Sequence, residues 1–262
     1  VGTDGYGNVY PGAQIPFGGI QMSPDTDSRF YDAASGYKYN HLTLMGFSLT
    51  HLSGTGIPDL GDFLFIPGTG GMKLEPGTHE DPDKGYRSRY SHDKEWASPN
   101  YYAVELADYG VKAEMTSGVR SGMFRFTYPE SDSAFIMIDM NHTLWQSCEW
   151  SNLRMINDST ITGYKLVKGW GPERHVYFAA AFSKKLSGLQ FLQDKKPVIY
   201  NTSRFRSGYE AWGKKLMVRL SFDTREGEEI LVKTAISAVS TEGALRNLKE
   251  LDGMTFDALK AR

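Results

Sequence analysis

Side chains that can do chemistry are concentrated in the stretch from Gly46 to Gly56, which has the sequence Gly-Phe-Ser-Leu-Thr-His-Leu-Ser-Gly-Thr-Gly. It holds one histidine, four hydroxyl side chains and three glycines, and two acids, Asp59 and Asp62, follow directly. Glycine adopts backbone conformations that other residues avoid and lets a chain approach a ligand closely. Polar loops of this kind on a rigid scaffold are where binding groups tend to lie. The stretch therefore predicts a ligand-facing loop.

Two interpretations of this loop are open. Ser53 as the nucleophile of a serine hydrolase is disfavoured, because His51 and Thr55 occupy the positions where a nucleophile elbow needs glycine. His51 is either a ligand contact, since loops often carry binding residues, or a structural histidine bonded to the backbone of a tight loop.

A second polar stretch, Asp25-Thr-Asp27-Ser-Arg29, lacks the glycine and glutamate that a calcium-binding EF-hand loop requires. It forms either a turn in which the aspartates bond to nearby backbone, or a set of groups that bind sugar hydroxyls. Four tryptophans could include a platform on which a sugar ring stacks, although most tryptophans serve packing. These four are Trp145, Trp150, Trp170 and Trp212.

Composition excludes several function classes. The 262 residues carry 29 basic and 31 acidic side chains without a basic block, so no nucleic-acid partner is expected. The single cysteine, Cys148, allows neither an internal disulfide nor a thiolate metal cluster. No apolar run is long enough to predict a membrane span. A start at Val1 without Met is typical of a trimmed or domain-level sequence.

Hydrophobic patterning predicts an all-β fold. Residues 1–100 are rich in Gly, Pro, Asp and Tyr, which indicates short strands between long ordered loops. Near-alternation of polar and apolar residues then predicts a series of half-buried strands, and the apolar run 134–138 predicts a strand buried on both faces. The expected strands are 63–66, 102–106, 111–115, 123–128, 134–138, 161–167, 176–182, 216–222 and 230–238. This spacing, with almost no helix between strands, is typical of a large antiparallel β-sandwich.

A helical pattern is confined to the C-terminal end. Residues 244–251 repeat apolar side chains at intervals of three and four, with Ser240 or Thr241 as the N-cap. A second helix is expected to start near Thr255 and to be cut off by the end of the chain. We therefore predict a sandwich over residues 1–239 and a helical linker over residues 240–262 that leads to a segment beyond this chain.

Several short motifs, in the same order along nearly the whole chain, resemble the N-terminal domain of family 92 glycoside hydrolases, the calcium-dependent exo-α-mannosidases of bacteria. The matching segments are 2–4, 10–13, 16–18, 21–26, 35–37, 46–48, 50–56, 97–99, 101–102, 163–164, 169–170, 176–178, 240–244 and 247–248. Each motif is weak alone, whereas the ordered combination is specific.

The resemblance implies a sandwich like that of galactose mutarotase, a linker helix and an (α/α)6 helical domain. In that family the helical domain carries the general acid, the general base and the calcium, so calcium is expected there and no cofactor in this chain. The sandwich packs on the helical domain and contributes loops to the mannose pocket. The implied activity is inverting hydrolysis of terminal α-mannosides of a glycan, in an exported bacterial protein of the periplasm or cell surface. This chain alone is expected to be inactive.

For contacts to sugar we expect Asp25, Asp27, Arg29, Tyr37, His51, Ser53 and Gly54, because charged and hydroxyl groups on glycine-bearing loops can bond several sugar hydroxyls. The alternative for Asp25 and His51 is that they only hold the two loops together. Two other functions stay open. One is a stand-alone, non-catalytic carbohydrate-binding module, which would bind mannosides by itself through an aromatic platform. The other is a purely structural domain that shields the helical domain.

Overall fold

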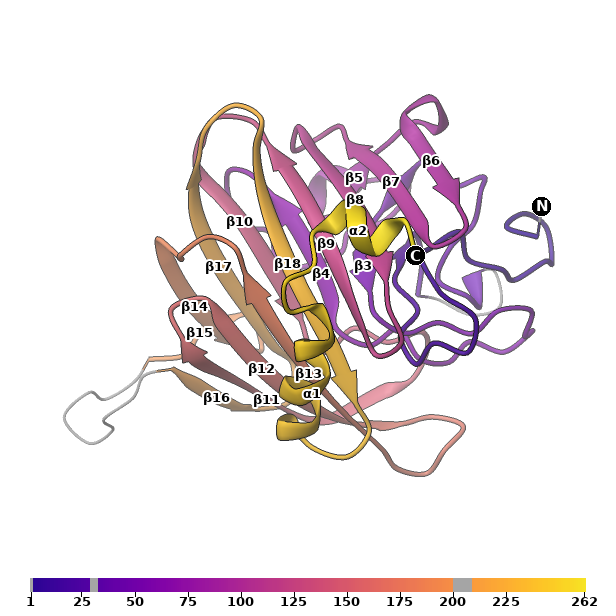
Figure 1. Ribbon diagram of the computed structural model, residues 1–262. Coiled ribbons are helices and arrows are strands. Elements are labelled where there is room, and N and C mark those ends of the chain that lie inside the picture. Colours follow the sequence, from indigo (N-terminus) through magenta and orange to yellow (C-terminus); the bar gives the residue numbers. More distant parts are fainter. Residues whose placement is uncertain (1, 29–32, 200–208) are drawn as a thin grey trace.

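The computed structural model describes residues 2–28, 33–199 and 209–262. Two large antiparallel sheets face each other, and a third sheet has two short strands. Figure 1 shows the sheets as layers, with the helices α1 and α2 lying against one of them. The predicted large antiparallel β-sandwich with C-terminal helix is confirmed.

The seven-stranded sheet contains, in spatial order, β1 (Ser23–Asp25), β3 (Gly46–Ser48), β4 (Leu64–Gly68), β10 (Ser131–Asp139), β17 (Leu216–Thr224), β14 (Gly188–Gln193) and β15 (Lys196–Pro197). The nine-stranded sheet contains β16 (Glu210–Gly213), β11 (Ser147–Asn157), β12 (Thr160–Lys168), β13 (Arg174–Phe182), β18 (Glu228–Ser237), β9 (Ser121–Tyr128), β8 (Val111–Ser117), β7 (Tyr101–Leu106) and β6 (Glu95–Ser98). The small sheet pairs β2 (Thr43–Leu44) with β5 (Ser88–Arg89). All nine predicted strands are present.

The main hydrophobic core lies between the two large sheets. Phe47 and Phe65 of the seven-stranded sheet meet Phe124 of the nine-stranded sheet, with ring centroids 6.3 Å and 5.2 Å apart. All three side chains are fully buried. These contacts arise because alternate residues of each strand point to the same face.

Strand β10 is buried on both faces, as its continuous apolar run predicts. Ile136 and Ile138 belong to the main core, whereas Phe135 and Met137 belong to a second apolar cluster on the opposite face of the strand. The second cluster includes Tyr86, which lies in the long N-terminal loops. These loops therefore cover the outer face of the seven-stranded sheet at this point.

The C-terminal helices lie on the nine-stranded sheet. Helix α1 (Thr241–Leu248) contacts β18 and β13, and α2 (Phe256–Lys260) contacts β8 and β9 (Figure 1). Ser240 caps α1 by accepting a hydrogen bond from the Gly243 amide at 3.0 Å, as the sequence predicts. A short 3-10 helix, η4 (Lys249–Leu251), separates the two. None of the helices within the described residues has the length and hydrophobicity that crossing a membrane requires.

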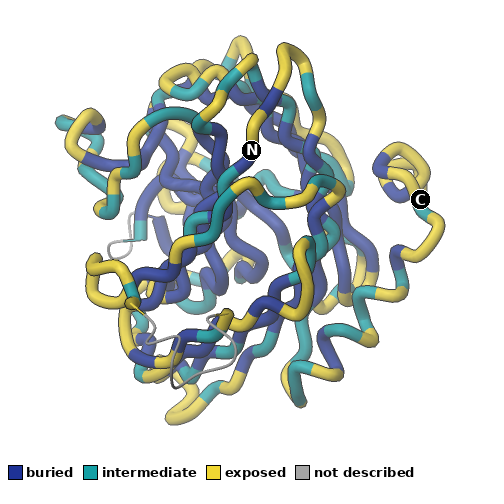
Figure 2. The backbone as a smooth tube through the Cα atoms, turned by 90° about the vertical axis from the view of Figure 1, so that its left-hand side faces the viewer, coloured by how far each residue is buried: buried dark blue, intermediate teal, exposed yellow. Residues whose placement is uncertain are grey.

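The first hundred residues contain strands of two to five residues joined by long loops, as the glycine- and proline-rich composition predicts. Two 3-10 turns, η2 (Pro82–Lys84) and η3 (His92–Lys94), lie among these loops. Many loop residues are buried (Figure 2), including every residue from Met22 to Asp27 and from Thr43 to His51. The loops that carry the predicted site are thus packed into the body of the domain.

Candidate functional site

The connection between β3 and β4, residues 49–63, contains His51 and is called the histidine loop here. Hydrogen bonds between its two ends close it at the base. The Leu49 amide donates to the Asp62 carbonyl at 2.9 Å, and the Gly61 amide donates to the Thr50 carbonyl at 2.8 Å. Beyond this base the loop is tied at one point to the N-terminal segment, where the Gly54 amide donates to the Asn8 carbonyl at 2.7 Å. Ser53 and Gly54 are exposed. The structure therefore presents the tip of this loop to solvent from a rigid base.

At the base of the loop, the carboxylate of Asp25 lies between two imidazoles. Its Oδ1 is 2.8 Å from Nε2 of His51, and its Oδ2 is 3.0 Å from Nε2 of His142. The second ring nitrogen of His51 lies 2.8 Å from the Gln21 carbonyl. The Asp25 and His51 side chains are completely buried. These contacts join three segments that are far apart in the sequence.

Burial alone would raise the pKa of the Asp25 carboxyl, but the two histidines outweigh it and hold this pKa well below its usual range. A buried carboxylate with both oxygens bonded cannot reach a substrate or solvent. The contacts of Asp25 and His51 therefore link the loop to β1 and to the segment after β10, and their contact to sugar stays a prediction.

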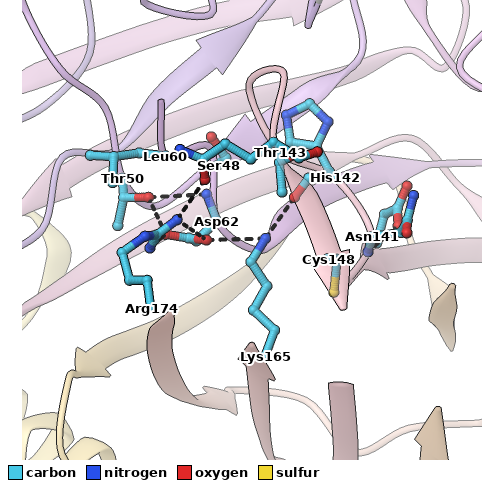
Figure 3. A network of polar contacts seen from close by, with 12 residues as sticks. Ser48, Thr50, Leu60, Asp62, Asn141, His142, Thr143, Cys148, Lys165 and Arg174 are labelled. Atoms are coloured by element: carbon cyan, nitrogen blue, oxygen red, sulfur yellow. Dashed lines mark hydrogen bonds and ion pairs between the residues drawn. The ribbon is translucent and has the colours of Figure 1, made fainter. Parts of the chain in front are cut away.

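A second buried network lies beside the first and bridges the two sheets (Figure 3). Asp62, which precedes β4, accepts a hydrogen bond from Thr50 at 2.7 Å and pairs with Lys165 of β12 at 3.0 Å. Arg174 of β13 pairs with the same carboxylate at 2.5 Å. Lys165 also donates to the His142 carbonyl at 2.6 Å, which connects this network to the Asp25 cluster.

Asp62 and Lys165 are both completely buried. Burial would raise the pKa of the Asp62 carboxyl, but the Lys165 and Arg174 cations outweigh it and lower this pKa below its usual range. A buried ion pair of this kind contributes little net stability, but it becomes costly when one partner is removed. The pair therefore fixes the base of the histidine loop against the nine-stranded sheet.

Asp27 lies at the edge of a histidine cluster. Its side chain is 9% exposed, and its Oδ2 is 3.4 Å from Nε2 of His79. His79 packs against His41 with ring centroids 4.0 Å apart, and Arg87 lies 3.1 Å from Nδ1 of His79. Burial, together with His79, lowers the pKa of His41 to about 4. Arg29, which we expect to act beside Asp27, lies outside the described residues.

Tyr37 is nearly fully buried and donates its hydroxyl to Glu95 at 2.9 Å. Tyr102 donates to the same carboxylate at 2.6 Å, and His92 lies 2.5 Å from it. Burial raises the pKa of the Tyr37 hydroxyl well above its usual value, so it remains a donor. This cluster lies at a separate pocket, lined also by Tyr10 and Tyr39.

The buried residues among the described part of the predicted site form three groups. Asp25 and His51 are brought together in one network, whereas Asp27 and Tyr37 each belong to a separate buried cluster. Only Ser53 and Gly54 are exposed among the described ones. Of the described residues in this set, Asp25, Asp27 and His51 are buried in the framework, and the glycine-bearing tip of the loop is exposed.

Lys165 and Arg174 were not among the residues predicted for the site. A signal for Lys165 exists, because it shares the inward face of β12 with Ile161, Gly163 and Val167, all buried. A lysine on that face requires a buried acid as its partner. Arg174 begins β13 and carries no comparable signal.

The acids buried at the base of the histidine loop do not form a calcium site. Within that part of the chain no group of three or more His, Cys, Asp and Glu side chains could hold a metal ion. Asp25 and Asp62, the two acids buried at the base of the loop, already face imidazole, ammonium and guanidinium groups. Oxygen-rich coordination of the kind calcium prefers does not arise from this donor set.

Comparisons with known proteins identify the family. The sequence matches the glycosyl hydrolase family 92 N-terminal domain over residues 1–237. The structure is similar to that of a family GH92 α-mannosidase from Bacteroides thetaiotaomicron in complex with mannoimidazole, with a TM-score of 0.97 and 90% sequence identity over 100% of this chain and 34% of that chain. A family GH92 inverting mannosidase from the same organism gives a TM-score of 0.77 at 21% identity, over 97% of this chain and 32% of that chain. At that identity the likeness supports the fold alone.

A curated relative is more distant. An uncharacterized secreted glycosidase of Arthroderma benhamiae is 29% identical over 140 residues, which cover 51% of this chain and 17% of the relative. This chain therefore spans about a third of the solved relatives named above and a smaller part of the curated one. Because the family match extends from the first residue to the end of the last strand, the chain belongs to glycosyl hydrolase family 92 as its N-terminal domain.

Proposed function

We propose that this domain belongs to an exo-acting α-mannosidase and contributes loops to its mannose pocket. Support comes from the match to a GH92 α-mannosidase at 90% identity over the whole chain. In this proposal the general acid, the general base and calcium belong to an (α/α)6 domain that follows this chain, and the domain alone is inactive. The C-terminal helices α1 and α2 would lead toward that partner.

One observation of the structure supports the proposed role of this domain in sugar binding. The tip of the histidine loop is exposed, and its base is held by buried ionic contacts. Ser53 and Gly54 are exposed, while Asp25, His51 and Asp62 beneath them are buried and paired. A loop that is already ordered loses little conformational entropy when it binds a ligand. We therefore assign sugar contact to the tip of the loop and positioning to its base.

Hydrolysis with inversion is part of the same proposal. It requires an acid and a base on opposite sides of the sugar, far enough apart to admit a water molecule. Neither Asp25 nor Asp62 supplies such a group, since both are buried and bonded. The residues of this chain would orient the sugar, and those of the helical domain would transfer the protons.

The experiment is an assay of a longer protein that contains this chain and a helical domain after it, with calcium present. The substrates are α-1,2-, α-1,3- and α-1,4-linked mannobiosides, and the readout is released mannose. We expect release from at least one linkage, and none from this chain alone. Absence of mannose from all three would refute the proposal.

We also propose that the protein is exported from the cell, to the periplasm or the surface of a bacterium. Export is supported by the secreted glycosidase among the relatives. Fractionation of cells that express the longer protein tests it, and recovery in the cytoplasmic fraction would contradict it.

A further inference from the structure

A pocket of about 570 Å³ lies between three loops at the end of the sandwich that carries the histidine loop. The loops are the histidine loop itself, the connection from β10 to β11 and the connection from β12 to β13. Its walls include Ile57, Pro58, Trp145, Gln146, Lys168 and Trp170. Pockets that bind small ligands have this size, with aromatic walls and a few polar groups.

Two tryptophans face this pocket with much of their surface open. Trp145 is 52% exposed and Trp170 is 66% exposed. Trp145 also has a φ of +72°, a left-handed conformation that is uncommon for any residue but glycine. Strained backbone conformations cost about 1–3 kcal/mol and occur preferentially at functional sites. The Trp145 ring lies partly at the surface and lines the pocket.

The polar part of the pocket is held by the buried network. Nη2 of Arg174 donates to Oε1 of Gln146 at 3.1 Å, and Arg174 is itself anchored by Asp62 at 2.5 Å. Gly169 leaves room for the amide, because a side chain there would approach Nε2 of Gln146 to 2.4 Å. The Gln146 amide is therefore fixed before any ligand arrives. Lys168 adds an exposed ammonium group at the rim.

We propose that this pocket, within this chain alone, binds one pyranose ring of a neutral glycan. A pyranose has an apolar face whose C–H groups carry a small positive charge, and this face suits the negative face of an indole. Its hydroxyls match the amide of Gln146 and the ammonium of Lys168 as donors and acceptors. The choice of mannose as that ring rests on the proposed function.

The pocket is lined in part by the loop that we assign to sugar contact. Ile57 and Pro58 form one wall, and they follow Ser53 and Gly54 in the same loop. The same loop therefore contributes both the tip that we assign to sugar contact and one wall of this pocket. The pocket would then be a second binding position for the same glycan.

Two other tryptophans provide an internal control. Trp150 and Trp212 are 45% and 55% exposed, but they lie in the strands β11 and β16 and are absent from the lining of this pocket. Exposure alone therefore does not distinguish the proposed pair, whereas the pocket does.

The test is a titration of this chain, labelled with ¹⁵N, with methyl α-mannopyranoside and α-1,2-mannobiose. All five tryptophan indole N–H signals are followed, each assigned by a Trp→Phe variant. We expect the signals of Trp145 and Trp170 to shift with a dissociation constant of about 1–10 mM, and those of Trp150 and Trp212 to stay in place. Trp170→Ala should weaken binding at least about tenfold, whereas Trp212→Phe should leave it unchanged.

Shifts confined to Trp150 or Trp212, or no shift of any indole signal up to about 50 mM sugar, would overturn the proposal. Retained backbone spectra of Trp170→Ala would show that a loss of binding is not a loss of folding. The proposed mannosidase activity fails separately, in the assay of the longer protein. Shifts of Trp145 and Trp170 with a glucoside but not a mannoside would retain the pyranose pocket and reject mannose as its ligand.

Discussion

Asp25 and His51 form a hydrogen-bonded pair across 26 positions of sequence, with Oδ1 of the carboxylate 2.8 Å from Nε2 of the imidazole and both side chains completely buried. Because Asp25 ends β1 and His51 begins the exposed loop, the pair ties the loop to the edge of the seven-stranded sheet. The other carboxylate oxygen of Asp25 lies 3.0 Å from Nε2 of His142, which belongs to the segment after β10. Stability of the domain and geometry of the loop are therefore coupled through one carboxylate.

Replacement of Asp25 by Ala is expected to lower the free energy of unfolding by about 3 kcal/mol, because two buried imidazoles lose their partner. Urea unfolding at neutral pH measures it. Asp257→Ala is the matched control, since that side chain is 75% exposed and its loss should cost less than about 0.5 kcal/mol. Equal stability of the two variants would contradict the structural role of Asp25.

Acid should weaken the same pair. The folded-state pKa of Asp25 is depressed, so its stabilising contribution is present above the unfolded value of 3.8 and is lost as pH falls below that value. Asp25→Asn removes the titrating group and should reduce the loss of stability between about pH 4 and about pH 2.

His41 makes a separate prediction at higher pH. Its pKa is lowered from 6.5 to about 4 by burial and by His79. A group with a depressed folded-state pKa stabilises the fold above its unfolded pKa, so this contribution is lost as pH falls from 6.5 toward 4. In His41→Gln the free energy of unfolding should depend less on pH in this window. The exposed His175→Gln serves as control, and identical pH profiles for both variants would refute the assignment.

Sequence patterning predicts the strands well where side chains alternate or are continuously apolar, and it fails where the strand is polar. The sequence pattern did not predict strand β11, because polar residues interrupt it: Ser147, Glu149, Asn152 and Arg154. Its pairing with β12 is also irregular between Cys148 and Trp150. The strand exists because β12 and β16 pair with it on either side. That pairing is a tertiary property, which a local pattern does not contain.

The candidate site was predicted by residue type but not by arrangement. Asp25 and His51 stood out because they lie in polar loops, yet their shared partner His142 is 117 residues from Asp25. Its position depends on the order of β1, β3, β4 and β10 in one sheet. The position of Lys165 on the inward face of β12 could have indicated that this lysine is buried and paired. No local pattern in the sequence indicates that Asp62 is its partner.

The pair of Lys165 and Asp62 should show strong coupling. Lys165→Met leaves the buried carboxylate with fewer partners and is expected to cost about 3–5 kcal/mol of unfolding free energy. The double variant with Asp62→Leu should cost less than the sum of the two single changes, as a double-mutant cycle would reveal. Lys184→Met breaks a partly exposed pair with Glu228 and should cost less than about 1 kcal/mol. Additive effects at Lys165 and Asp62 would show that the two side chains do not interact.

Replacement of Ser53 tests whether the tip of the histidine loop contacts the sugar. In the longer protein, Ser53→Ala should lower kcat/KM for a mannobioside about tenfold, because the exposed hydroxyl is assigned to the sugar. Its thermal stability should stay unchanged, since the side chain is not packed. Ser159→Ala, in the turn between β11 and β12, is the control and should retain full activity. Unaltered kinetics of Ser53→Ala would remove Ser53 from the set of contact residues.

The central claim is that the buried Asp25–His51 pair positions a loop used in catalysis, and kcat/KM of His51→Ala in the longer protein tests it most directly. The comparison is Val232→Ala, which removes a fully buried side chain of β18 in the main core. Both variants are assayed well below their unfolding temperatures. We predict that His51→Ala loses at least about tenfold in kcat/KM, or about 1.4 kcal/mol of transition-state stabilisation, while Val232→Ala stays within about twofold of wild type. Equal kcat/KM for the two variants would contradict the claim and leave the pair with a role in stability alone.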